Sequence, residues 1–494
     1  MCGIAGIASP TEDWVVREML RTLRHRGPDG TGYHRDDHHA LAHARLSIID
    51  LGGGKQPMSD AADRSHVVFN GEIYNYQNLR EELRDTQFRT NSDTEVLLHL
   101  ANSEDEPRDW VPRLDGMFAF ALSQDDGLML ARDPLGIKPL YVGERDGALV
   151  FGSEIKAMLV ACNQVEEFPP GHIYTSDAGM HRYYELKSTA ESITTTEQAQ
   201  CGVRARLEAA VRKRLLADVP VGVFLSGGLD SSLIAALARR YKDPLDSFAV
   251  GTEDSEDLLR SRHVARQLGT RHHERIYTLE EALAVLPEVI YYLESFDCAL
   301  VRSAIPNYLL AKLAREHVTV ALSGEGADEL FAGYSYLKDV EPRLLQDELL
   351  HITRALHNTN LQRCDRMSMA HGLEVRVPFL DIELVSYAFQ MDTKLKLRGE
   401  EQTEKWILRR VAQELLPEDT VWRRKAKFAV GSGLSDALGI YAEQEISDED
   451  FARERNVGEG VELRSKEELL YYRVFRDQYP SDALLPPVGR SRSI

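Results

Sequence analysis

Residues 219–241, VPVGVFLSGGLDSSLIAALARRY, join an apolar run, a double glycine and a segment rich in alanine and leucine. The first part favours a buried β-strand and the last part an α-helix, with the glycines at the turn between them. The next segments, DSFAVG, DLLRSRHVARQLG and HHERIY, continue this alternation of strand and helix. Strands that alternate with helices predict a doubly wound α/β domain around a parallel sheet.

The turn SGGLDSS at residues 226–232 is typical of a loop that binds phosphate. Adjacent glycines let backbone N–H groups point at one anion, and the N-terminus of the following helix adds partial positive charge. Asp230 would repel a bare phosphate, so we expect a Mg²⁺ ion between the two. The alternative is an ordinary glycine turn with Asp230 as a helix cap, and the local chemistry favours neither.

A second glycine turn, SGEGADE at residues 323–329, follows the apolar run VTVAL. Loops at the carboxyl ends of parallel strands meet at one crevice, so we expect Glu325 and Asp328 to face Ser226 and Asp230 across a nucleotide. Asp328 is then the second Mg²⁺ ligand. Two glycine turns that both carry carboxylates are a more specific signal than either turn alone.

The N-terminal part of the chain is rich in short apolar or alternating runs, such as CGIAGIA, LAHARLSIID, HVVFNGEIY and GMFAFALSQ. Gly, Asp and Pro turns separate these runs, which predicts a β-rich domain with some helices. A Thr-, Ser- and Ala-rich segment follows, and the residues after about 340 are mostly helical by period. We expect domains at 2–185 and 203–480, a linker at 186–202 and a disordered tail at 481–494.

Cys2 stands directly after the initiator methionine and opens the first apolar run. One interpretation is a small buried residue in a first strand. The other is a catalytic cysteine that becomes the N-terminus when Met1 is removed. A thiol needs a base to become a nucleophile, and an N-terminal cysteine carries one in its own α-amine, which titrates near neutral pH. The residue alone does not decide between the two.

The composition is that of an ordinary soluble globular protein, with 43% hydrophobic and 28% charged residues among 494, and this length predicts two or three domains. The formal net charge of −20 argues against nucleic acid as the main partner. Five scattered cysteines give neither a disulfide framework nor metal-site spacing, which favours a cytoplasmic location. Neither a signal peptide nor an apolar run of membrane length is evident, so we expect no membrane partner.

Three groups of motifs resemble one family. MCGIAGI, RHRGPD, ARLSIID and NGEIYNY are similar to the glutaminase domain of class II amidotransferases, which are N-terminal-nucleophile hydrolases. SGGLDSS and LSGEGADELFAGY resemble the pyrophosphate-loop ATP-binding domain, and GLEVRVPFLD and KAKFAVGSG resemble the C-terminal part of glutamine-hydrolysing asparagine synthetases. The resemblance covers nearly the whole chain in the family's order. It implies an α+β N-terminal-nucleophile hydrolase sandwich, followed by an α/β synthetase domain with a doubly wound parallel sheet and a helical C-terminal part.

The resemblance implies roles for residues of the first domain. Cys2 attacks the side-chain amide of glutamine, and Asn70 and Gly71 form the oxyanion hole, which stabilises the charge of a tetrahedral intermediate. A guanidinium such as that of Arg45 suits the glutamine α-carboxylate, although a surface ion pair is the alternative for Arg45 and for Asp93. The implied glutamine-binding residues are Arg45, Leu46, Ser47, Ile48, Ile49, Asn70, Gly71, Glu72 and Asp93.

In the second domain the resemblance implies that Glu325 acts in forming a β-aspartyl-AMP intermediate. It also implies that Lys425 balances charge near this intermediate, for which a solvated basic run is the alternative. Asp365 and Arg376 match positions of the aspartate or intermediate pocket, and pairing of Arg376 with Glu374 or Asp381 is the structural alternative. The implied ATP-binding residues are Leu225, Ser226, Gly227, Gly228, Asp230, Ser231, Ser232, Val250, Ser323 and Gly324, and the implied Mg²⁺ ligands are Asp230 and Asp328.

The implied activity is ATP-dependent synthesis of asparagine. Hydrolysis of glutamine at Cys2 supplies ammonia, and the second domain converts aspartate to its adenylate, which ammonia turns into asparagine with release of AMP. The implied substrates are glutamine, aspartate and ATP with Mg²⁺, and the resemblance makes a homodimer plausible. Two alternatives remain: a related amidotransferase with a different carboxylic acid acceptor, and a non-catalytic glutamine or nucleotide sensor. The presence of Cys2, Asp230 and Glu325 favours an enzyme, because a sensor can lose all three.

Overall fold

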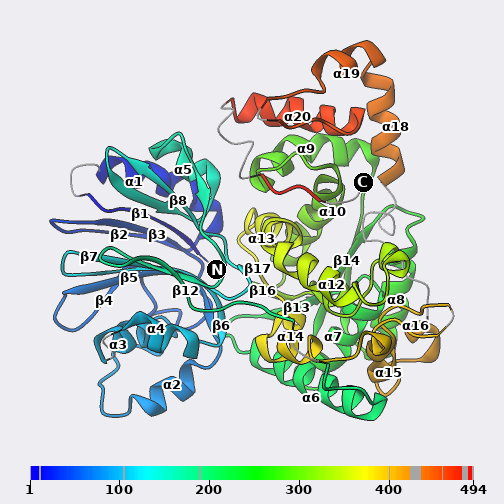
Figure 1. The fold of residues 1–494 in the computed structure, drawn as a ribbon, viewed down its shortest axis with the longest axis horizontal. Helices are drawn as coiled ribbons and strands as arrows, with labels where there is room; N and C mark the ends of the chain where they lie inside the picture. The colour runs from blue at the N-terminus through cyan, green and yellow to red at the C-terminus, as the bar shows by residue number, and fades with distance from the viewer. Residues whose placement is uncertain are drawn as a thin grey trace.

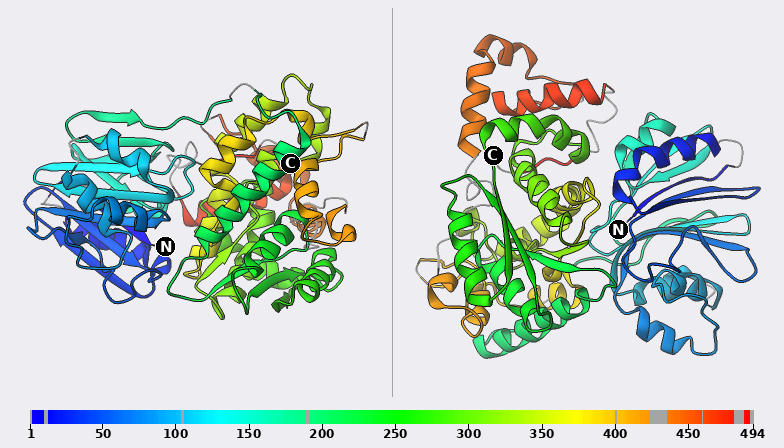
Figure 2. Two further views of the ribbon diagram at one scale, coloured as in Figure 1. Left: turned by 90° about the horizontal axis from the view of Figure 1, so that it is seen from below. Right: turned by 180° about the vertical axis from the view of Figure 1, so that it is seen from behind.

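The computed structural model describes residues 2–9, 13–103, 106–188, 191–399, 401–422, 435–458, 460–480 and 488–491. Two bodies lie side by side, and the N-terminus lies where they meet (Figures 1 and 2). The N-terminal body holds two antiparallel sheets, and the C-terminal body holds one parallel sheet surrounded by helices. The predicted fold class is confirmed for both bodies.

Each sheet of the N-terminal body has six strands, all paired antiparallel. The first has the order β10-β8-β9-β1-β3-β2 and the second β12-β11-β7-β6-β5-β4. The strands are β1 (Gly3–Ile7), β2 (Gly30–Arg35), β3 (Ala40–Arg45), β4 (Met58–Ser59), β5 (Ser65–Ile73), β6 (Gly116–Gln124), β7 (Gly127–Arg132), β8 (Tyr141–Arg145), β9 (Ala148–Gly152), β10 (Glu166–Glu167), β11 (His172–Thr175) and β12 (Gly179–Arg182). Their helices are α1 (Asp13–Thr22), α2 (Tyr76–Glu82), α3 (Glu95–Ser103), α4 (Pro107–Trp110) and α5 (Ile155–Ala161).

Burial follows the layers of this body. Ile4 and Leu41 from the first sheet pack against Val68 and Ala119 from the second, so the two sheets face each other. Helices α1 and α5 cover the outer face of the first sheet, and α2 to α4 cover that of the second (Figure 1). Strand β6 is therefore buried on both faces, which explains why its sequence GMFAFALSQ is almost continuously apolar.

The C-terminal body is built on a five-stranded parallel sheet with the order β15-β14-β13-β16-β17. Its strands are β13 (Val221–Phe224), β14 (Asp246–Gly251), β15 (Arg271–Ile276), β16 (Val320–Leu322) and β17 (Glu374–Arg376). The chain runs outward from β13 in one direction and then returns to add β16 and β17 on the other side. The loops after β13 and β16 thus lie next to each other at the switch point of the sheet, where α/β proteins bind ligands.

The helices of this body are α6 (Thr196–Arg214), α7 (Leu229–Arg239), α8 (Glu256–Leu268), α9 (Leu279–Leu293), α10 (Cys298–Arg315), α11 (Ala327–Leu330), α12 (Leu345–Arg354), α13 (Asn360–Met369), α14 (Ile382–Ala388), α15 (Trp406–Ala412), α16 (Glu418–Val421), α18 (Ser435–Glu445), α19 (Asp448–Glu454) and α20 (Lys466–Gln478). Helices α18 to α20 form the end of the chain beside α9 and α10 (Figure 1). No helix among the described residues combines the length and the apolarity needed to cross a membrane.

Two expected segments, the linker and the tail, are partly described by the structure. Helix α6 begins at Thr196, inside the expected linker 186–202, and Ile193 of that segment is buried and bonded to the Gln390 carbonyl. Within the expected tail, residues 481–487 and 492–494 lie outside the described residues. Residues 488–491 of that segment are described, with Val488 buried and the N–H of Ser491 donating to Asp297 at 2.9 Å, and the expected disorder of the tail stays a prediction.

Candidate active sites

Cys2 lies just before β1, buried in a small pocket. Its main-chain nitrogen, which becomes the α-amine when Met1 is removed, donates a hydrogen bond to Oδ1 of Asn70 at 3.0 Å. Burial raises the pKa of the Cys2 thiol, so the thiol needs a base before it can attack. The pocket is lined by Cys2, Arg45, Leu46, Ile48, Ile49, Gly54, Gln56, Phe69, Gly71, Glu72, Ser92, Asp93 and Thr94.

Asn70 and Gly71 lie in β5, paired with Ala119 and Phe118 of β6. The side chain of Asn70 is fully buried, and its Nδ2 has no hydrogen-bond partner among the described residues. A Cβ atom on Gly71 would lie 2.1 Å from a carbonyl oxygen of β6, so only glycine lets the two strands approach here. Attack by the neighbouring thiol on a carbonyl group would create an oxyanion, and this oxyanion would be the acceptor that the buried N–H group lacks.

Arg45 makes no surface ion pair among the described residues. Its guanidinium donates to the main-chain carbonyl oxygens of Asp50 at 2.8 Å and Leu51 at 3.1 Å, which fixes it at the rim of the Cys2 pocket. The other predicted residues of the first site line this pocket, apart from Asn70, which reaches it through its bond with the Cys2 nitrogen, and Ser47. The N–H of Ser47 instead donates to the Asp29 carboxylate at 2.8 Å.

Two buried carboxyl groups, Glu72 and Asp93, line the same pocket, so Asp93 is not part of a surface ion pair. Burial raises the pKa of Asp93 to about 6. Burial and the neighbouring Glu374 carboxylate raise the pKa of Glu72 well above its usual value. Together with the guanidinium of Arg45 at the rim, these two carboxyl groups suit a ligand that carries both an ammonium and a carboxylate group.

The second pocket lies at the loops after β13 and β16. Gly227 has a left-handed backbone (φ 71°), and a Cβ there would lie 2.5 Å from neighbouring backbone, so the turn requires glycine. Ser231 Oγ accepts from the N–H of Ser226 at 3.2 Å and donates to the Gly228 carbonyl at 3.3 Å. Gly228 itself is the N-cap of α7, without a side-chain cap bond, so the alternative of Asp230 as a helix cap is wrong.

The nucleotide-loop residues that line this pocket as predicted are Leu225, Ser226, Gly228, Asp230, Ser231, Val250, Ser323, Gly324, Glu325 and Asp328. Gly227 and the buried Ser232 do not line it. Asp230 and Asp328 come from the two adjacent loops and share one cation, the ammonium group of Lys405. Two carboxylates that converge on one cation fit a Mg²⁺ ion, which prefers oxygen ligands.

Several charged residues of this pocket were not predicted from the sequence. Lys405 and Arg363 line it, and Nη2 of Arg363 lies 2.5 Å from Oε1 of Glu325. Glu329 also lines it, and burial raises its pKa to about 7. Arg363 and Lys405 lie far from the glycine turns in sequence, and neither stands in a local pattern that indicates a nucleotide site.

Asp365 and Arg376 do not line the nucleotide pocket, and their place in an aspartate or intermediate pocket stays a prediction. Helix α13 turns Arg363 toward that pocket and Asp365 toward the first domain, where Asp365 pairs with Arg26 at 2.8 Å. Arg376 pairs with Glu374 at 2.5 Å, as the structural alternative predicted, and reaches Glu72 of the Cys2 pocket at 3.2 Å. Lys425 lies outside the described residues.

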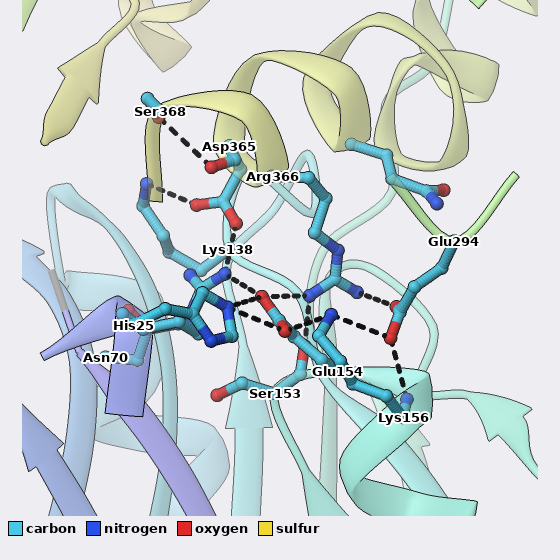
Figure 3. Close-up of polar contacts among 12 residues, drawn as sticks. His25, Asn70, Lys138, Ser153, Glu154, Lys156, Glu294, Asp365, Arg366 and Ser368 are labelled. Carbon is cyan, nitrogen blue, oxygen red and sulfur yellow. Dashed lines mark hydrogen bonds and ion pairs between the residues drawn. The ribbon is translucent and has the colours of Figure 1, made fainter. Parts of the chain in front are cut away.

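A buried cluster of charges joins the two domains (Figure 3). Arg366 of α13 lies between Glu154 of the first domain, at 2.8 Å, and Glu294 of the second, at 3.0 Å. The Glu294 carboxylate also accepts the N–H groups of Ile155 at 3.0 Å and Lys156 at 2.7 Å. These are the first two residues of α5, whose own N-cap side chain makes no cap bond, so a residue of one domain caps a helix of the other.

The chain matches two family models: a glutamine amidotransferase domain over residues 1–198, and asparagine synthase over residues 202–347 and 338–484. It is 38% identical over 523 residues to asparagine synthetase [glutamine-hydrolyzing] 2 of Arabidopsis thaliana, covering 100% of this chain and 90% of that protein. It is 38% identical to asparagine synthetase [glutamine-hydrolyzing] of Triphysaria versicolor, covering 99% of this chain and 89% of that protein. A probable asparagine synthetase of Dictyostelium discoideum is 36% identical, covering 99% and 96%.

Proposed function

This chain belongs to the glutamine-hydrolysing asparagine synthetases, and we propose that its two pockets carry the two halves of that reaction. The enzyme converts aspartate to asparagine with ATP and takes the nitrogen from glutamine. The N-terminal domain, proposed as residues 2–185, releases ammonia from glutamine. The C-terminal domain, proposed as residues 203–480, activates aspartate, and residues 186–202 connect the two.

In the first half, the α-amine of Cys2 takes the thiol proton and Sγ attacks the side-chain carbonyl carbon of glutamine. The charge that develops on the oxygen is met by Nδ2 of Asn70 and the N–H of Gly71. Collapse of the intermediate breaks the C–N bond, and the α-ammonium of Cys2 returns its proton to the leaving nitrogen, which departs as ammonia. Water then hydrolyses the thioester to glutamate and the free thiol. Arg45 holds the glutamine α-carboxylate. Glu72 and Asp93, whose carboxyl groups line the pocket, hold the α-ammonium.

In the second half, the glycine turns bind the ATP phosphates through backbone N–H groups and serine hydroxyls. The β-carboxylate of aspartate attacks the α-phosphorus and pyrophosphate leaves. Ammonia then attacks the acyl carbon of the adenylate, and AMP leaves with formation of asparagine. Asp230 and Asp328 are the residues that would hold Mg²⁺, which supplies positive charge to the phosphates when bound. Glu325, fixed by Arg363, acts where the adenylate forms, and Lys425 is proposed to lie nearby.

Ammonia must reach the second pocket in its neutral form, because ammonium has no lone pair with which to attack. We propose an internal route that keeps bulk water away. The place of Cys2 at the junction of the domains supports this route, since residues of the second domain reach its pocket through Arg376. We further propose a cytoplasmic location, supported by five cysteines that are all free, and a homodimer, which stays a prediction. The net charge of −20 supports the absence of a nucleic-acid partner.

The observation that supports the first half-reaction most directly is at Asn70. Its buried Nδ2 has no hydrogen-bond partner among the described residues, while its Oδ1 accepts the hydrogen bond from the Cys2 nitrogen. The test is Cys2→Ala, assayed for asparagine formation with glutamine and with ammonium chloride. We expect loss of glutamine hydrolysis and of glutamine-dependent synthesis, while ammonia-dependent synthesis remains and rises with pH. Cys2→Ala enzyme that still hydrolyses glutamine contradicts the proposal. A screen of carboxylic acids for pyrophosphate release checks aspartate against the alternative acceptors, and mass spectrometry checks that Met1 is absent.

A further inference from the structure

Lys405 lies in the nucleotide pocket with its ammonium group between the two carboxylates proposed to bind the metal. Its Nζ lies 2.6 Å from Oδ1 of Asp328 and also contacts Oδ2 of Asp230. The side chain is 3% exposed, so water does little to solvate its charge. Of the three, only the two carboxylates were predicted as parts of the site.

Several features hold the lysine in this position. Its backbone is left-handed (φ 53°), a conformation that residues other than glycine rarely adopt, and it precedes the first turn of α15. Gly333 packs directly against the pair: a Cβ there would lie 1.8 Å from Oδ1 of Asp328 and 2.2 Å from Cε of Lys405. The other described cations of the pocket have separate partners, Arg363 with Glu325 and Arg409 with Glu404, at 2.5 and 2.6 Å.

We propose that Lys405 is the resident counter-ion of the metal site, which admits a divalent cation together with the phosphates of ATP and not before them. This inference rests on the proposed roles of Asp230 and Asp328 as metal ligands. It adds that the divalent cation binds with ATP and not before it, and that Lys405 contacts the nucleotide.

The charges of the site explain this order. A divalent cation alone would neutralise Asp230 and Asp328 and would leave the Lys405 ammonium buried without a counter-charge, which is strongly unfavourable. A cation that enters with ATP is accompanied by the triphosphate, which carries about four negative charges. The displaced ammonium can then pair with a phosphate oxygen in the same pocket. Lys405 thus keeps the two carboxylates together in the free enzyme and binds phosphate in the complex.

The test measures binding of Mn²⁺, as a spectroscopic substitute for Mg²⁺, to the full-length enzyme by electron paramagnetic resonance. Without nucleotide we expect only weak binding to the wild type, and one site that is tighter by at least about tenfold in Lys405→Met, where the competing charge is gone. Lys405→Arg keeps the charge and should behave as the wild type. Addition of ATP should give the wild type one Mn²⁺ per nucleotide bound.

A double variant, Lys405→Met with Asp328→Asn, should lose the gained site. Lys405→Gln repeats the test with a polar side chain if the methionine variant does not fold, and circular dichroism checks both. Lys405→Met should also unfold at a lower temperature than the wild type in EDTA and regain stability when Mg²⁺ is added.

Equal Mn²⁺ affinity of Lys405→Met and wild type, tight binding to the nucleotide-free wild type, or a gained site that survives Asp328→Asn would each overturn the proposal. Asparagine formation by the wild type from aspartate, ATP and ammonium is measured on the same preparation. This assay tests the proposed function, whereas Mn²⁺ binding tests the role of Lys405, so the failure of one proposal can be told from the failure of the other.

Discussion

The pocket at Cys2 lies among antiparallel strands, and its proposed reacting groups are a thiol, a main-chain nitrogen and an amide. The nucleotide pocket opens at the ends of parallel strands, and its lining includes several paired charges. In the first, the groups proposed for chemistry, the Cys2 nitrogen and Asn70, are neutral or supplied by the main chain. In the second, Asp230, Asp328 and Glu325 are each held by a cation. A thioester reaction needs only a few aligned donors, whereas handling a nucleotide requires control of several charges at once. Loss of one charge should therefore damage the second pocket more than loss of one neutral donor damages the first.

The largest effect is expected for Asp230→Asn. The substitution keeps the shape of the side chain but removes one of the two charges proposed to hold the metal. Asparagine synthesis should fall by about 10³-fold or more with either nitrogen source, while glutamine hydrolysis persists. Pyrophosphate release and glutamate formation, measured on one preparation, separate the two pockets. Pyrophosphate output at the wild-type rate would remove Asp230 from the metal site.

A smaller loss is expected for Asn70→Ala, which deletes the unpartnered Nδ2 donor. The kcat of glutamine hydrolysis should fall by about 10²- to 10³-fold, with less change in KM, because the donor acts on charge that develops only in the transition state. Ammonia-dependent synthesis should stay at the wild-type rate and serves as the control. A variant in which KM alone changes would assign Asn70 to substrate binding instead.

The pH dependence of glutamine binding should distinguish the pockets further. Burial raises the pKa of Asp93 to about 6, so the carboxylate that is proposed to hold the glutamine ammonium becomes protonated as the pH falls through this value. KM for glutamine should therefore rise below about pH 6, by up to about tenfold per pH unit. Asp93→Asn should have a high KM with little dependence on pH in this range. A wild-type KM that is flat between pH 5 and 7 would contradict the role of Asp93.

The smallest effect on catalysis, and a clear one on stability, is expected for Glu294→Gln at the domain interface. It leaves Arg366 and Lys156 buried without this counter-charge, which should lower the free energy of unfolding by about 3 kcal/mol. Each half-reaction should change only a few-fold, because neither pocket includes Glu294. Urea unfolding measures the difference, with Glu316→Gln, an exposed residue, as the matched control. Equal stability of the two variants would show that the cluster contributes no net stabilisation.

The parts predicted well from sequence are those in which backbone conformation and chemistry coincide. Gly227 is required by a left-handed turn, and the strand-turn-helix pattern around it predicts both the sheet and the loop. Lys405 was missed because a single basic residue before a helical pattern gives no local signal, and only the tertiary fold brings it to Asp230. A motif indicates that a residue is constrained but does not show which side of a sheet or helix it faces, so the contacts of Asp365 and Arg376 with the first domain were not predicted.

The contact of Glu294 with α5 has a consequence for how the enzyme is made. A ribosome completes residues 155 and 156 long before residue 294, so the newly made N-terminal domain has a helix whose first N–H groups await their acceptor. Those groups gain it only when α9 of the second domain has formed. The strand that leads into α5 pairs with the strand that follows Cys2, so this late bond bears on the surroundings of the nucleophile. The N-terminal domain thus acquires the last hydrogen bonds of α5 only when the second domain has been made.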